Sequence, residues 1–96
     1  MQNWGERKFR SSMLSQGYWA EIKMGDVHLR LFSEDNAQGV QASVYNVNTK
    51  TWVTPSETVE NIEDGKDVAE RHAREYLKQI TSLEMPVLEW KRARST

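Results

Sequence analysis

Cysteine is absent from the sequence, and histidine occurs only as His28 and His72. Without cysteine the chain can form neither a disulfide nor a thiolate metal site, and thiol catalysis is excluded. The two histidines lie far apart and belong to no cluster of His, Asp and Glu at metal-ligand spacing. We therefore expect no metal site and no cofactor.

Long apolar runs are also missing. No stretch approaches the roughly 20 apolar residues that a helix needs to cross a bilayer, and the opening MQNWGERKFR lacks the apolar segment of a signal peptide. The formal net charge is only −1, so overall charge gives no argument for binding nucleic acid. These absences predict a cytoplasmic protein with no membrane partner.

Motifs for catalysis are not found. The sequence contains no P-loop, no GxGxxG and no GxSxG. The acidic run between Glu57 and Asp67 lacks the ligand spacing of a calcium loop, and we interpret it as a solvated edge or a contact for a basic partner. We expect no catalytic residues and no enzymatic activity, with a small hydrolase built from dispersed residues as a distant alternative.

The chain has 96 residues, of which 38% are hydrophobic and 28% charged. This length and composition fit one small globular domain. Residues 1–16 are polar with scattered apolar positions and predict a flexible arm or a short helix. Residues 17–91 are expected to form the domain, and 92–96 a basic, frayed tail.

Residues 18–32 predict a β-hairpin. Gly25-Asp26 is a two-residue turn signal with glycine first, as a type II′ turn prefers. Counting from this turn pairs Ile22 with Leu29 on an aliphatic face. The other face then pairs oppositely charged Glu21 with Arg30, two aromatics, Trp19 with Phe32, and Lys23 with His28. Much of the second face is thus explained by strand pairing.

A second pair of strands is predicted after the polar residues 33–39. Residues 40–47 alternate, with Val40, Ala42 and Val44 on the aliphatic side. A tight turn at Asn48-Thr49 would pair Tyr45 with Trp52, and Pro55 would end the strand. Residues 56–63 fit either a short strand or a loop.

An amphipathic helix is predicted after Asp64-Gly65, with Asp64 as its N-cap and an end near Ser82. Its apolar stripe is expected to comprise Val68, Ala69, His72, Ala73, Tyr76, Leu77 and Ile80. Residues 87–91 predict a short final strand. The fold class is therefore α+β: an antiparallel meander of about four strands, with one helix packed on its aliphatic face.

A β-meander followed by one helix resembles, at the level of topology, the Whirly and coactivator-type single-stranded DNA-binding domains. It also resembles small HicB-like antitoxin domains. The resemblance rests on the order of elements and carries no site residue over to this chain.

The second sheet face is the candidate binding surface. It combines aromatic and basic residues, namely Trp19, Lys23, His28, Arg30, Phe32, Tyr45 and Trp52. A large exposed apolar patch usually marks a contact site. The face could pair with a second copy of the chain, be covered by Trp4 and Phe9 of the arm or by Trp90, bind another protein, or stack single-stranded bases. We expect a small non-enzymatic interaction module that forms a homodimer, with single-stranded nucleic-acid binding as the main alternative.

Overall fold

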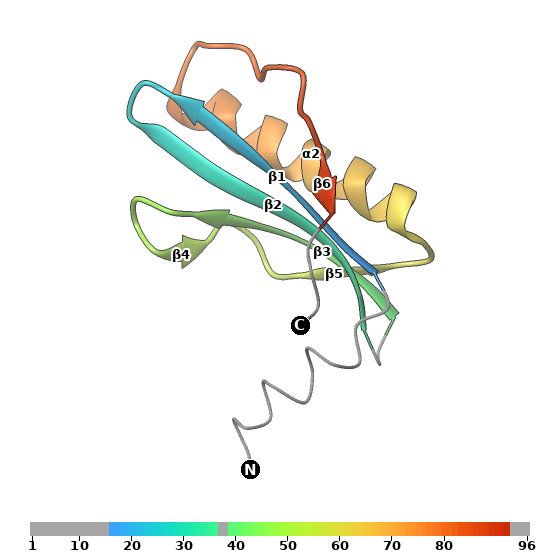
Figure 1. Cartoon of the computed structure of the whole chain (residues 1–96). Helices are drawn as coiled ribbons and strands as arrows, with labels where there is room; N and C mark the ends of the chain where they lie inside the picture. The colour runs from blue at the N-terminus through green and yellow to red at the C-terminus, as the bar shows by residue number, and fades with distance from the viewer. Residues whose placement is uncertain (1–15, 37–38, 93–96) are drawn as a thin grey trace.

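The structure is a computed structural model that describes residues 16–36 and 39–92. Its elements in chain order are β1 (Gln16–Met24), β2 (Val27–Asn36), β3 (Gly39–Asn46), β4 (Thr51–Trp52), β5 (Glu57–Val59), α2 (Ile62–Ile80) and β6 (Lys91–Arg92). The strands form one antiparallel sheet in the order β4-β3-β2-β1-β6, with β5 also pairing with β3. The helix crosses one face of this sheet (Figure 1), so the predicted two-layer α+β fold is confirmed.

The predicted arm at 1–16 lies outside the described residues except for Gln16, which begins β1. Of the predicted tail at 92–96, only Arg92 is described, and it pairs with Tyr18 in the sheet. No helix in the described part of the chain combines the length and the apolar character needed to span a membrane.

The hairpin of β1 and β2 has the predicted register. Ile22 pairs with Leu29, and both are fully buried. Gly25 has a φ of 57°, whereas Asp26 is not among the residues with positive φ. A positive φ at the first central residue alone is the signature of a type II′ turn, so the predicted turn is confirmed too.

The hairpin of β3 and β4 has the predicted pairing of Tyr45 with Trp52 but not the predicted turn. Residues 47–50 form a four-residue loop instead of a two-residue turn at Asn48-Thr49. A two-residue hairpin turn requires positive φ at its first central residue, which favours glycine, asparagine or aspartate. Here Lys50 takes the positive φ of 59°, and the buried side chain of Asn46 accepts a hydrogen bond from Thr49 N at 3.1 Å.

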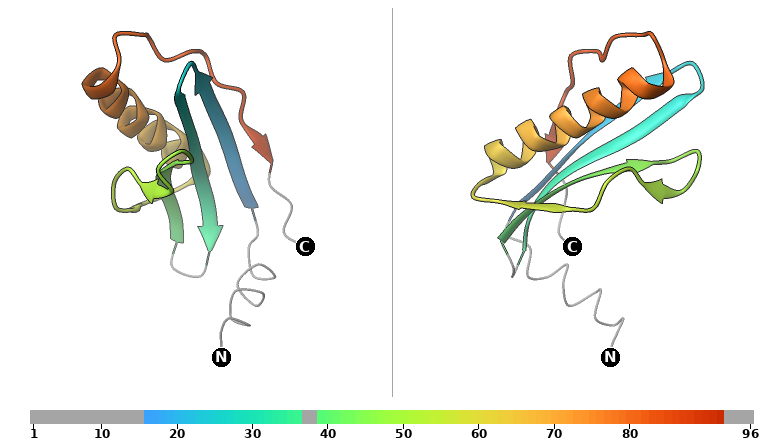
Figure 2. Two further views of the ribbon diagram at one scale, coloured as in Figure 1. Left: turned by 90° about the vertical axis from the view of Figure 1, so that its left-hand side faces the viewer. Right: turned by 180° about the vertical axis from the view of Figure 1, so that it is seen from behind.

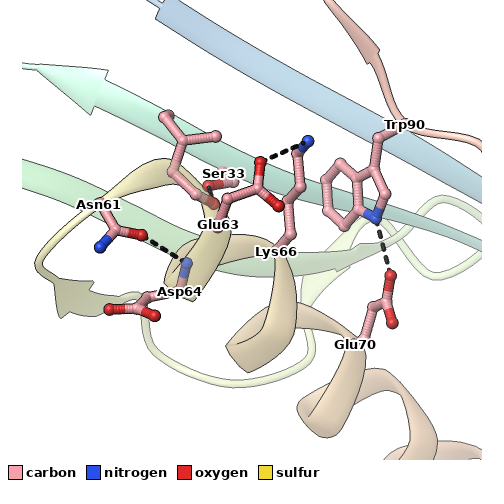
Figure 3. Close-up of polar contacts among 8 residues, drawn as sticks. Ser33, Asn61, Glu63, Asp64, Lys66, Glu70 and Trp90 are labelled. Atoms are coloured by element: carbon pink, nitrogen blue, oxygen red, sulfur yellow. Dashed lines mark hydrogen bonds and ion pairs between the residues drawn. The ribbon is translucent and has the colours of Figure 1, made fainter.

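The helix begins three residues earlier than predicted, so the assignment of Asp64 as N-cap is wrong. Asn61 is the N-cap, and its Oδ1 accepts a hydrogen bond from Asp64 N at 2.8 Å (Figure 3). Gly65 lies inside the first turn, where it meets Ser33 and Val40 of the sheet. The helix ends at Ile80, and Thr81 caps it.

The core lies between α2 and the aliphatic sheet face, as predicted. The fully buried positions of α2 recur every four residues, at Gly65, Ala69, Ala73 and Leu77. They pack against buried sheet residues that include Ile22, Leu29, Leu31, Ala42 and Val44. Ile80 lies off this line and is 47% exposed, so its predicted place in the buried stripe is wrong.

The segment after α2 differs from its prediction. The final strand is Lys91–Arg92, not 87–91, and it pairs with β1. Trp90 points to the helix, where its Nε1 donates a hydrogen bond to Glu70 Oε2 at 2.8 Å (Figure 3). Since α2 lies on the aliphatic side, Trp90 does not cover the opposite face of the sheet, and that alternative is excluded.

Candidate interaction surface

The seven predicted binding residues share the sheet face opposite α2, which we call the aromatic face. Successive side chains of a strand point to opposite sides, and the neighbours of these residues in the strands are the buried core residues. The predicted binding residues on this face are Trp19, Lys23, His28, Arg30, Phe32, Tyr45 and Trp52, and Glu21, Glu34 and Ser43 lie on the same side. In Figure 2 the helix lies on one side of the sheet, and no other described element lies against the opposite side.

Trp52 is the most prominent side chain of the aromatic face. It lies on the two-residue strand β4, and 57% of its surface is exposed. Its ring contacts Tyr45 edge-to-face at a centroid distance of 4.8 Å and Phe32 at 6.0 Å. Such edge-to-face pairs contribute about 0.5–1.5 kcal/mol beyond the burial of their area, so Trp52 is held in a defined position although it is exposed.

Trp19 has different neighbours from those predicted. Its Cα is paired with that of Phe32, as expected, but the ring of Phe32 contacts Trp52. Trp19 instead lies beneath two cations, with Arg30 Cζ at 5.9 Å and Lys91 Nζ at 5.4 Å from the ring centroid. Lys91 was missed by sequence reasoning because its place beside Trp19 depends on where β6 pairs with β1.

Glu21 interacts with two basic side chains in the middle of the aromatic face, His28 and Arg30. Its Oε2 accepts hydrogen bonds from His28 Nε2 at 2.5 Å and from Arg30 Nε at 3.2 Å. The hydrogen bond from His28 is the largest cause that holds the pKa of Glu21 below its ordinary value, and partial desolvation opposes it. The predicted pair of Glu21 and Arg30 is therefore present, and His28 contacts Glu21 diagonally in addition to facing Lys23 across the ladder.

Glu21→Gln is expected to lower the free energy of unfolding at neutral pH and to matter less in acid. Because the pKa of Glu21 is lower in the folded protein, its contribution is complete above the ordinary value of 4.5 and is lost as the pH falls through the folded pKa. Chemical denaturation of both proteins from neutral to acidic pH measures this. A stability difference that stays constant below pH 4.5 would contradict it, and the exposed Glu89→Gln is the control.

The fold divides the predicted acidic run, Glu57 to Asp67, among β5, α2 and the residues that join them. Glu57 lies in β5 and accepts a hydrogen bond from His72 Nε2 at 3.0 Å, with Arg71 Nη2 at 3.5 Å. Glu63 pairs with Lys66 at 3.1 Å. Within residues 16–36 and 39–92, no three His, Asp or Glu side chains converge as a metal site would require. The hydrogen bond between His72 and Glu57 links α2 to β5.

Comparisons of the chain with protein families, curated proteins and solved structures give no match.

Proposed function

We propose that the protein is a non-enzymatic interaction module that forms a homodimer through its aromatic face. The observation that supports this most directly is the exposed Trp52, fixed by Tyr45 and Phe32 on a face that no other described element covers. Burying apolar surface contributes about 25 cal/mol per Å². Rigid, central tryptophan and tyrosine side chains are the residues that most often dominate the binding energy of an interface.

The charges of the aromatic face are arranged so that two copies can complement each other. Lys23 lies beside the β1–β2 turn, and Glu34 lies toward the opposite end of β2, where it pairs with Gly17 and Gln41. Neither forms an ion pair with another described residue. A two-fold axis across the strands would bring Lys23 of each copy toward Glu34 of the other, as an isologous interface requires.

Single-stranded nucleic acid is the alternative occupant of this face. Base stacking on aromatic rings can contribute roughly 1–3 kcal/mol per base, but it acts together with a positively charged groove that follows the backbone. Arg30 and Lys91 already lie over Trp19, and Glu21 and Glu34 place negative charge among the rings. The arrangement therefore favours a protein partner.

Trp52→Ser is expected to weaken the dimer without unfolding the protein. A hot-spot residue contributes about 2 kcal/mol or more, which equals roughly thirtyfold in the dissociation constant. Because the ring is more exposed than buried, the monomer should keep its fold. Sedimentation equilibrium over a range of protein concentrations measures the dissociation constant, and circular dichroism and thermal melting check the fold.

Ile80→Ser is the matched control, because Ile80 is also a large exposed hydrophobic residue but lies on α2. It should leave the dimer unchanged. A wild-type protein that stays monomeric at every concentration would refute the homodimer. If Trp52→Ser instead abolishes salt-sensitive binding of a mixed-sequence single-stranded oligonucleotide, nucleic acid is the ligand. If it unfolds the protein, the aromatic face is internal.

A further inference from the structure

A groove unrelated to the aromatic face lies between the C-terminal half of α2 and the segment that follows it. Figure 1 shows this segment leaving the helix and crossing to β6. The groove has a volume of about 670 Å³, which falls within the roughly 300–1,000 Å³ typical of small-molecule sites. One wall consists of α2 residues between Glu70 and Lys78 together with the C-cap Thr81, and the other consists of residues 82–88.

The second wall of the groove is mainly apolar and open to solvent. Val87 is 100% exposed and Leu83 is 55% exposed. Met85 and Leu88 are half-buried and pack against the core. Apolar surface in a concave site is the feature that gives ligand pockets their affinity, so the groove is suited to an apolar ligand or an apolar tail.

The helix wall adds two unpaired cations. Arg74 and Lys78 are one turn apart, line the groove and form no ion pair with a described residue. Two acids also line the groove: Glu70 accepts a hydrogen bond from Trp90 Nε1, and Glu84 is an exposed residue of the segment, on the wall opposite the two cations. Two neighbouring cations beside apolar side chains complement a ligand with an anionic head and an apolar tail.

The segment that forms the second wall is fixed at both ends. At its start, Thr81 Oγ1 accepts a hydrogen bond from Leu83 N at 3.1 Å. At its end, Trp90 Nε1 donates a hydrogen bond to Glu70 Oε2 at 2.8 Å, and the Trp90 ring centroid lies 6.0 Å from Lys66 Nζ. Beyond it, β6 pairs with β1. The groove is therefore formed before a ligand arrives, which lowers the cost of ordering it on binding.

The geometry points to a binding site for a free, single-chain carboxylate amphiphile in this groove. Its carboxylate would pair with Arg74 and Lys78, and its chain would lie along Leu83, Met85, Val87 and Leu88. This site is independent of the dimer, because none of these residues belongs to the aromatic face.

Isothermal titration of the full chain with dodecanoate below its micelle concentration tests the site. We expect saturable binding of one dodecanoate per chain. The double variant Arg74→Gln/Lys78→Gln should bind at least about tenfold more weakly, as expected for the loss of charged hydrogen bonds. Val87→Glu should also weaken binding, and because Val87 is fully exposed the variant should keep its fold.

Two controls distinguish binding in the groove from nonspecific association with the amphiphile. Lys50→Gln removes the same charge from an exposed residue of the β3–β4 loop and should bind as the wild type does. The dodecyltrimethylammonium cation has the same tail and should not bind. The assignment is overturned by equal binding of this cation, by unchanged affinity in the double variant, or by binding to anionic phosphatidylglycerol vesicles without binding of monomeric dodecanoate. Loss of dodecanoate binding in Trp52→Ser alone would place the site on the aromatic face and also overturn it.

Discussion

Leu77→Ala is expected to lower the free energy of unfolding by about 2–5 kcal/mol, the range for large-to-small substitutions in a packed core. Leu77 is 2% exposed, and the other fully buried positions of α2 are Gly65, Ala69 and Ala73. The helix therefore contributes only one large, fully buried side chain to its contact with the sheet. A loss of this size is a considerable part of the roughly 5–15 kcal/mol that stabilises a typical domain.

The matched control is Ile80→Ala on the same helix. Ile80 is 47% exposed, so its truncation removes little buried area and should change stability by only about 0.5 kcal/mol. Chemical denaturation of the wild type and both variants gives the comparison. If Leu77→Ala costs no more than Ile80→Ala, then α2 is peripheral to the core and the packing described above is wrong.

The register of the first hairpin could be predicted because two independent signals agree. The Gly25-Asp26 turn and the alternation of apolar residues both place Ile22 opposite Leu29, and a slip by one residue would expose every aliphatic side chain of the strand. The same alternation fixes the side of the sheet on which each residue lies. That is why all seven predicted residues do lie on the aromatic face.

The start of the helix could not be predicted because Gly65 was interpreted from local sequence alone. A glycine near a helix end is an ordinary boundary signal, yet here it permits a close approach to Ser33, which is distant in sequence. The exposure of Ile80 likewise could not be predicted from local sequence. Its helical phase fits an apolar stripe, but the buried line of α2 follows the four-residue spacing from Gly65 to Leu77.

The neighbours of the aromatic side chains and the groove were also beyond sequence reasoning. Diagonal contacts such as Phe32 with Trp52 depend on sheet twist and on the loop before β4. The groove is lined by a non-periodic segment, so no repeat of period 2 or 3.6 reveals it. The available signal was the presence of Leu83, Val87 and Leu88 around Pro86, apolar residues without a strong pattern for strand or helix.

Gly65→Ala is expected to lower the free energy of unfolding by about 1–4 kcal/mol, although alanine is the better helix former by roughly 1 kcal/mol. An added Cβ would overlap Ser33 Oγ and come 3.1 Å from Ser33 Cβ and 3.2 Å from Val40 Cγ1. Ser33 is fully buried, and its Oγ donates a hydrogen bond to the Ile62 carbonyl at 2.9 Å. In the variant, rotating the Ser33 hydroxyl away would leave it buried without this hydrogen-bond partner. Keeping the hydrogen bond would instead require the helix to move away from the sheet.

A double-mutant cycle with Ser33→Ala separates this overlap from a general effect of Gly65 on the helix. Without the hydroxyl, Gly65→Ala should cost at least about 1 kcal/mol less than it does in the wild type, because the largest overlap is gone and only the contacts with the Cβ of residue 33 and with Val40 remain. Ser43→Ala is the matched control, since Ser43 is a buried serine on the aromatic face. Its effect on the free energy of unfolding should be additive with that of Gly65→Ala. Chemical denaturation of each single and double variant supplies the free energies. If Ser33→Ala is as additive as Ser43→Ala, within about 0.5 kcal/mol, then the close packing of Gly65 on Ser33 does not determine how near α2 lies to the sheet.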